Sequence, residues 1–302
     1  MSANQRNSAV RAALATALIL AAPCARAQAE GESQDAFETK HIFGFTEGTD
    51  VGDAGDKELE FTTTGSIGKR GGGGYNAIEQ KGVYEGAASD RFGYEVGPLG
   101  LSQQIANVPG LANLSQTSFS GVAAEPKYIF VKRGIDAPFG LAVSVAPEWD
   151  RIDPVTGAHV SNFVLETKIY LDSELIEKKL YAAANLIYAP ETDHETGVGF
   201  SQYALTGATA ALTWRITPTI AIGAETEFYQ VYNSLGFTGR IGSAAYVGPT
   251  LWAQITPKAF MSLAWSAQIA GNPANGGPST LDLYNQSDIA RERVHLVVGF
   301  AF

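Results

Sequence analysis

The segment "VHLVVGFAF" (Val294–Phe302) alternates strictly between two kinds of side chain and decides the fold class. Successive side chains of a β-strand point to opposite faces of the sheet. One face of this strand is apolar and ends in an aromatic ring: Val294, Leu296, Val298, Phe300 and Phe302. The other face is small near its end and charged further back: Ala301, Gly299, Val297, His295, Arg293 and Arg291. A strand between lipid and a polar lumen has this pattern, and the edge strand of a β-sandwich is the alternative.

The N-terminus has the organisation of a secretory signal peptide. Arg6 and Arg11 precede the apolar run "AALATALILAA", which is too short to span a membrane as a mature helix. The small residues of "ARA" (Ala25–Ala27) form a cleavage site, with a cut two residues later as the alternative. We therefore expect residues 1–27 to be a signal peptide that directs export through the general secretory pathway.

Composition limits what the exported chain can be. Cleavage would remove Cys24, the only cysteine, and Pro23 before it argues against a lipid anchor. The mature chain would carry 18 basic against 31 acidic residues, a net charge of −13, which argues against nucleic acid as a partner. No later segment reaches the roughly 18 consecutive apolar residues that a spanning helix needs. Residence in a membrane would therefore require β-strands.

Twelve segments with the alternation of strands follow residues 28–57, an acidic, glycine-rich stretch that we expect to be a periplasmic N-terminal arm. The predicted strands are 58–68, 75–87, 91–103, 118–131, 139–151, 159–171, 179–190, 200–214, 219–231, 240–255, 259–270 and 288–302. They predict an all-β fold, a transmembrane antiparallel up-and-down β-barrel of about twelve strands over residues 58–302. Ten and fourteen strands are the alternatives.

The connections between the predicted strands separate by parity. The second, eighth and tenth are tight: "SDR" (Ser89–Arg91), "ITPT" (Ile216–Thr219) and "ITPK" (Ile255–Lys258). The first, third, seventh and eleventh are longer and polar: "KRGGGGYN", "IANVPGLANLSQTS", "PETDHETGVG" and "GNPANGGPSTLDLYNQS". Bacterial barrels have short periplasmic turns and long outer loops, so this parity favours an even strand count with both termini periplasmic. "KRGIDAP" and "DSELIEKK" fit less well, because both are long for periplasmic turns.

Most charges within the strands fall on the face predicted to line the lumen. The predicted lumen-lining residues are Glu58, Glu60, Glu125, Lys127, Glu148, Asp150, Glu166, Lys168, Glu225, Glu227, Arg291 and Arg293. Because acids outnumber bases in this set, we expect a porin-like barrel that transports small solutes or ions and prefers cations. Replacing Glu225 and Glu227 by glutamine should then weaken the cation preference. Closure of the barrel brings Arg291 and Arg293 towards the wall with Glu58 and Glu60, subject to register.

A second interpretation keeps the barrel but removes the pore. The same charges could pair with one another and fill a narrow lumen, which would make the protein a non-conducting structural or adhesive barrel. The N-terminal arm could also fold into the lumen as a plug. Twelve strands lie between the filled eight-stranded and the open sixteen-stranded barrels, so strand count does not decide between these interpretations.

The third interpretation is an outer-membrane lipid hydrolase or protease, because such enzymes place a few polar residues at the barrel rim. His159 and Ser161 share a face near Asp150 and Asp153, and Asp193–His194 lie in a predicted outer loop. Adjacent acids and histidines are common in polar loops, and the four histidines are scattered along the chain. We therefore expect no catalytic residue, no metal ligand and no cofactor.

The chain resembles an uncharacterised family of bacterial outer-membrane β-barrel proteins whose function is unassigned. The matching segments are Phe45–Glu60, Gly68–Ala77, Ala137–Asp153, Leu186–Glu191 and Trp265–Gly271. The resemblance implies a barrel in the bacterial outer membrane and carries over no catalytic or ligand residue.

The last strand is similar to the C-terminal assembly signal of such barrels, formed here by Val294, Leu296, Val298, Phe300 and Phe302. The expected partners are therefore outer-membrane lipid and the barrel-assembly machinery, whereas the oligomeric state is left open.

Overall fold

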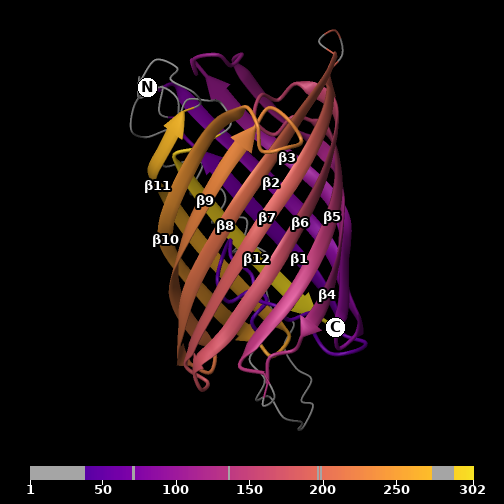
Figure 1. Cartoon of the computed structure of the whole chain (residues 1–302), viewed down its shortest axis with the longest axis vertical. Coiled ribbons are helices and arrows are strands. Elements are labelled where there is room, and N and C mark those ends of the chain that lie inside the picture. Colours follow the sequence, from indigo (N-terminus) through magenta and orange to yellow (C-terminus); the bar gives the residue numbers. More distant parts are fainter. Residues whose placement is uncertain (1–37, 70–71, 135–136, 196, 198, 274–288) are drawn as a thin grey trace. The chain divides into compact units, whose positions relative to one another are not determined.

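The computed structural model describes residues 38–69, 72–134, 137–195, 197, 199–273 and 289–302. The predicted signal peptide, residues 1–27, lies outside these residues. Twelve antiparallel strands form a closed barrel in which each strand pairs with its neighbours in sequence and β1 pairs with β12 (Figure 1). The predicted fold class is therefore confirmed. Within the described ranges, no helix has the length and apolar character needed to cross a membrane.

The strands agree with the predicted strands in number and order. They are β1 (Lys57–Ile67), β2 (Gly74–Ser89), β3 (Phe92–Ala106), β4 (Leu114–Val131), β5 (Phe139–Ile152), β6 (His159–Ile176), β7 (Leu180–Glu195), β8 (Gly199–Thr217), β9 (Ile220–Tyr232), β10 (Arg240–Thr256), β11 (Ala259–Pro273) and β12 (Glu292–Ala301). The main differences are at strand ends. Paired backbone extends into sequence that is polar enough to resemble a loop, as in "PETDHETGVG" between β7 and β8.

The two-residue turns gather at one end of the barrel, where they join β2 to β3, β8 to β9 and β10 to β11. Three residues join β6 to β7 at this end, and three also join β7 to β8 at the opposite end. The connection from β4 to β5, with seven residues, is the long one at the end of the two-residue turns. The segment "DSELIEKK" mostly continues β6, which removes one of the two exceptions to the predicted parity. The first residue of β1 lies at this end beside the C-terminus, since the Phe302 N–H donates to the Lys57 carbonyl at 3.1 Å.

Side chains on the two faces of the barrel have the inverse of the distribution in a soluble protein. On the outer face Leu59 pairs with Phe300 and Phe61 with Val298, and Phe61 is 47% exposed. The fully buried residues include Glu227, Asn185 and Gln103, which face inwards. Apolar atoms outside and polar atoms inside are expected of a barrel whose outer surface is solvated by lipid.

The register of the closing pair separates charges that could have met there. Glu58 lies opposite Ala301, whereas Arg293 lies opposite Ser66 near the other end of β1. Arg293 instead forms an ion pair with Glu227 of β9. Arg293 of the last strand therefore pairs with Glu227 inside the barrel and not with the carboxylates of β1.

We predict that an arginine at Leu186 destabilises the barrel. Leu186 is 55% exposed and pairs with Ile169 of β6 and Ala208 of β8 on the outer face. An arginine near the bilayer midplane of such a barrel costs about 2–4 kcal/mol. Urea unfolding from phospholipid vesicles measures this loss of free energy. Leu235→Arg, in the loop between β9 and β10, is the control, and an equal loss in both variants would contradict a lipid-facing Leu186.

Candidate functional site: a plugged lumen

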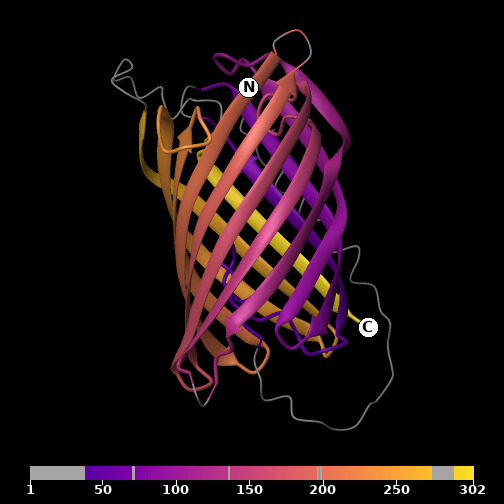
Figure 2. The ribbon, with the colours of Figure 1, turned by 45° about the vertical axis from the view of Figure 1, so that its right-hand side comes forward.

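Residues 38–56 lie inside the barrel, and we call this segment the plug. It is the indigo segment within the ring of strands in Figure 1, and it is visible from a second side in Figure 2. Ile42 and Phe43 are fully buried, as are the polar residues Thr39, Thr46 and Thr49. The described part of the N-terminal arm therefore occupies the lumen, which was the alternative considered for it from the sequence.

Side chains of the barrel wall satisfy the backbone of the plug, which has no regular secondary structure of its own. The Phe45 and Thr46 N–H groups donate to Glu225 at 3.2 and 3.0 Å. Asn185 accepts from the Glu47 N–H at 2.8 Å and donates to the Glu47 carbonyl at 2.9 Å. Since buried backbone groups need partners, these polar wall residues specify where the plug sits.

The same pattern continues at the C-terminal half of the plug. The Thr49 N–H donates to Asp172 at 2.9 Å, and the Lys127 ammonium donates to the Gly48 carbonyl at 2.7 Å. Arg133, in the connection between β4 and β5, forms ion pairs with Asp172 at 2.7 Å and Asp50 at 3.3 Å. This end of the plug is therefore fixed to β4, β6 and an adjoining turn.

Ion pairs fasten the first half of the plug to the wall. Lys40 is 3% exposed and binds the carboxylates of Glu85 and Glu95. Burial lowers the pKa of His41, but the neighbouring Glu60 carboxylate outweighs burial and raises it to about 9. Because this pKa is raised, the His41–Glu60 pair stabilises the plug at neutral pH and is lost as the pH rises through about 9.

Glu47 and Lys168 form the matching pair further along the plug, at 2.9 Å. Burial raises the pKa of Glu47, but the Lys168 ammonium outweighs burial and lowers the pKa to about 2. This pair therefore stabilises the plug at neutral pH and is lost only as the pH falls towards about 2.

An aromatic and charged cluster holds the middle of the plug. The Arg293 guanidinium lies over the Phe45 ring at 4.1 Å and forms an ion pair with the fully buried carboxylate of Glu227. Phe45 also contacts the His295 ring, at 4.9 Å between centroids. A buried ion pair of this kind is costly to break, because removal of one partner leaves an unpaired charge out of water.

Two connected cavities lie beside the plug. The first has a volume of about 300 Å³ and is bordered by Glu47 of the plug and by the wall carboxylates Glu60, Glu95, Glu125, Glu148 and Glu166. The second, of about 130 Å³, includes Glu79 and Asp150. Both cavities include Thr62, Lys81 and Glu148 in their linings, so a polar space extends from the plug along the lumen.

The structure divides the predicted lumen residues into three groups. Five border the larger cavity, Glu60, Glu125, Glu148, Glu166 and Lys168, and Asp150 borders the smaller one. Lys127, Glu225 and Arg293 contact the plug, Glu227 forms an ion pair with Arg293, and Glu58 lies beside His41. Arg291 is exposed and lies at the end of the last connection, directly before β12. The carboxylates of Glu225 and Glu227 already have partners, because Glu225 accepts from the plug backbone and Glu227 pairs with Arg293. Their effect on ion preference stays a prediction.

The wall residues that contact the plug and were missed in the sequence include Glu95, Asp172 and Asn185. Glu95 lies between the outward-facing Tyr94 and Val96, so strict alternation in β3 was a signal that could have identified it. Asp172 was assigned to a connection, because the polar segment after residue 171 did not resemble a strand. Asn185 had no such signal, as a neutral amide among alanines carries no charge pattern.

The residues considered for catalysis point in different directions. Asp150 is buried and faces inwards, whereas Ser161 is exposed on the outer face, where it accepts from the Trp149 indole N–H at 3.3 Å. Asp153 accepts from the N–H groups of the turn that follows it. The His194 ring contacts the Phe200 ring in a tilted arrangement, at 4.4 Å between centroids. These contacts assemble no nucleophile with a base from His159, Ser161 and their acidic neighbours.

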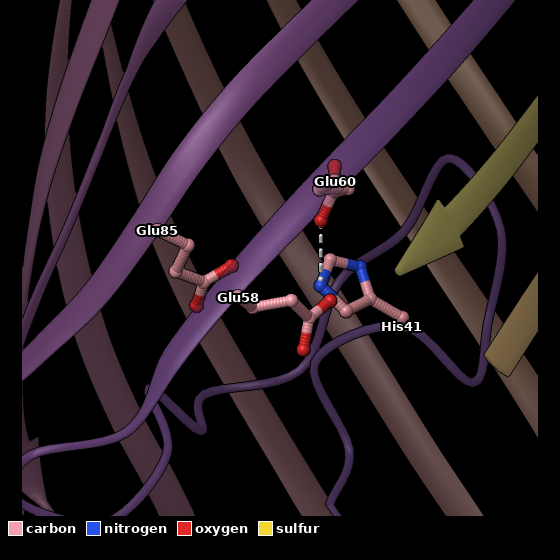
Figure 3. A group of neighbouring side chains, drawn as sticks. All are labelled: His41, Glu58, Glu60 and Glu85. Atoms are coloured by element: carbon pink, nitrogen blue, oxygen red, sulfur yellow. Dashed lines mark ion pairs between the residues drawn. The ribbon is translucent and has the colours of Figure 1, made fainter. Parts of the chain in front are cut away.

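One cluster of metal-ligating groups forms where the plug meets β1 and β2. His41, Glu58, Glu60 and Glu85 each direct one ligand atom into a space in which these atoms lie within 4.8 Å of one another (Figure 3). The sequence hid this cluster, because His41 precedes the nearest of the glutamates by a glycine-rich segment without periodicity.

Comparison with known proteins identifies the family. A family model described as a family of unknown function, DUF6662, matches residues 35–302. The curated proteins include no significant match.

Among solved structures, the chain is similar to the COG4313 outer membrane channel from Pseudomonas putida F1, with a TM-score of 0.56 and 12% identity over 84% of this chain and 98% of that one. It is also similar to the β domain of the Bordetella autotransporter BrkA, with a TM-score of 0.50 and 12% identity over 83% of this chain and 100% of that one. At such low identity these likenesses show the fold alone. The chain belongs to the DUF6662 family and has the closed barrel fold of outer-membrane proteins.

Proposed function

We propose that the protein is an outer-membrane channel for small solutes or ions, that it prefers cations, and that the plug closes its lumen at rest. One observation carries this proposal: the lumen contains a polar space with an excess of carboxylates, and that space is bordered by a segment held mainly through hydrogen bonds and ion pairs. Such contacts exchange readily for water, so the plug can leave without exposing a large apolar core.

Current through a planar lipid bilayer tests the proposal. Purified protein should give brief openings, and a potassium chloride gradient should shift the reversal potential towards that of potassium. The absence of current at every voltage, in the native protein and in a plug-deleted variant, would contradict transport. It would favour the non-conducting barrel, which the ion pair between Arg293 and the fully buried Glu227 would then stabilise.

We also propose that β12 carries the assembly signal for the outer membrane and its assembly machinery. Phe302 is 62% exposed, and its ring contacts Tyr84 on the outer face, at 6.3 Å between centroids. Phe302→Ala should lower the amount of folded barrel in the outer-membrane fraction several-fold, measured by heat-modifiable migration. Phe200→Ala is the control, because Phe200 is an exposed ring at the opposite end of the barrel. Equal yields of folded barrel from both variants would show that Phe302 is not part of the assembly signal.

A further inference from the structure

We propose that His41, Glu58, Glu60 and Glu85 bind a divalent transition-metal cation that fastens the plug to the barrel wall. The four residues come from three separate parts of the fold. Glu58 and Glu60 lie on β1, Glu85 on β2 and His41 on the plug. A cation bound by all four would therefore link the plug to the barrel wall.

The ligand atoms already converge. They lie within 4.8 Å of one another, and Figure 3 shows the three carboxylates around the imidazole ring. A tetrahedral site with bonds of about 2.0–2.2 Å requires ligand atoms roughly 3.4 Å apart. Rotation of the glutamate side chains by about an ångström would close the shell, because each is a flexible chain on a fixed strand.

Polar atoms without hydrogen bonds point to a missing ligand. Glu60 is 5% exposed, and its Oε2 atom makes no hydrogen bond within the described chain. Its partner is His41 Nε2, which lies 3.0 Å away as an ion pair. Glu58 Oε1 is buried and has neither a hydrogen bond nor an ion pair within the described chain. Buried polar atoms in native proteins are nearly always satisfied, so Glu58 Oε1 calls for a bound group beside the His41–Glu60 pair.

The charge around the cluster favours a cation. Lys40 pairs with Glu85 and Glu95, and Lys81 pairs with Glu95 at 3.1 Å. Glu58 has no basic partner within ion-pair distance among the residues that the structure places. The carboxylates of Glu58, Glu60, Glu85 and Glu95 outnumber the two lysines, and this excess of negative charge favours a divalent cation at the cluster.

The kinds of ligand atom limit which metal ions the cluster can bind. One imidazole nitrogen with carboxylate oxygens suits zinc and similar first-row cations, and the cluster offers no thiolate or thioether for a soft ion such as Cu(I). Calcium prefers six to eight oxygen ligands, which four side chains with one nitrogen do not supply. Zinc is therefore the probe to use, with calcium as the discriminating cation.

Isothermal titration of tag-free, full-length protein in detergent with zinc chloride tests the site. We expect one saturable zinc site, with affinity at least about tenfold weaker in Glu58→Gln and in His41→Gln. The matched controls are Glu79→Gln, an inward carboxylate outside the cluster, and His194→Gln, a histidine near the opposite end of the barrel. Heat-modifiable migration checks that each variant is folded, and His41→Gln changes the plug without changing a strand.

Absence of saturable zinc binding, equal binding of zinc and calcium, or equal weakening by His41→Gln and His194→Gln would overturn the site.

The role of the cation as a latch rests on the proposed function and has its own test. Zinc should lower the open probability of the native channel in a bilayer at least several-fold and leave His41→Gln unaffected. Zinc that binds in the titration but changes no openings would overturn the latch while leaving the site. If no variant conducts at all, the channel proposal fails, and the titration still decides whether the metal site exists.

Discussion

Deletion of residues 38–52 should raise the time-averaged current through the barrel by about 10- to 100-fold, if the native channel is open for about 1–10% of the time. The deletion removes the buried Ile42 and Phe43 and the half-buried Phe45, and leaves the polar turn that leads into β1. The wall partners Glu225 and Asp172 then face the lumen, where water can solvate them. Single-channel recording in a planar bilayer measures the change.

A point variant gives the same test with less disturbance. Gly44 has a φ of +133°, and a Cβ atom there would lie 2.6 Å from Glu225 Oε1 and 2.8 Å from Ala264 Cβ. Gly44→Val should therefore strain the plug and raise the open probability, to a level below that of the deletion. Ala54→Val, at an exposed plug position, is the control. Unchanged current in the deletion variant would show that the plug is not the barrier.

Replacing Glu148 and Glu166 by glutamine in the plug-deleted barrel should lower its preference for cations over anions by up to about 100-fold at low salt. Both carboxylates border the larger cavity. A unit charge about 6 Å away stabilises a passing cation and destabilises an anion by about 0.7 kcal/mol each in water, which changes the cation-to-anion ratio by about tenfold per charge. The effect should shrink as salt shortens the Debye length.

The reversal potential in a potassium chloride gradient reports this preference. Glu177→Gln is the matched control, because Glu177 is exposed in the turn between β6 and β7 and borders neither cavity. A reversal potential that responds equally to both sets of changes, or to neither, would show that the cavity carboxylates do not set the ion preference.

The alternation in the sequence predicts the barrel well, because it reports the solvent on each side of a strand. Val294–Phe302 shows this most clearly: its apolar face is the outer face of β12, and its partner on β1 follows from closure. The ends of strands were harder to predict. In β7, Thr192 and Asp193 are paired with β8 although their side chains are typical of loops, since backbone hydrogen bonds there do not depend on side-chain polarity.

The plug could not be predicted in detail, for a different physical reason. Its contacts join residues far apart in the chain, such as Thr46 with Glu225 and Glu47 with Asn185. The plug has no period of two or 3.6, because its backbone is satisfied by wall side chains and not by itself. Charge alone placed Glu225 and Glu227 on the inner face but could not show that their partners are a plug backbone and Arg293.

A reversible cross-link between plug and wall tests the central claim most directly. Thr49 Cβ lies 3.1 Å from the position that a Cβ atom on Gly140 would occupy, so a small outward shift of the plug reaches the roughly 3.5–4.5 Å spacing of disulfides. In the Thr49→Cys, Gly140→Cys variant, oxidation should abolish channel openings and reduction should restore them, while Thr49→Cys alone should respond to neither. Openings that persist unchanged after mass spectrometry confirms the disulfide would contradict a lumen gated by residues 38–56.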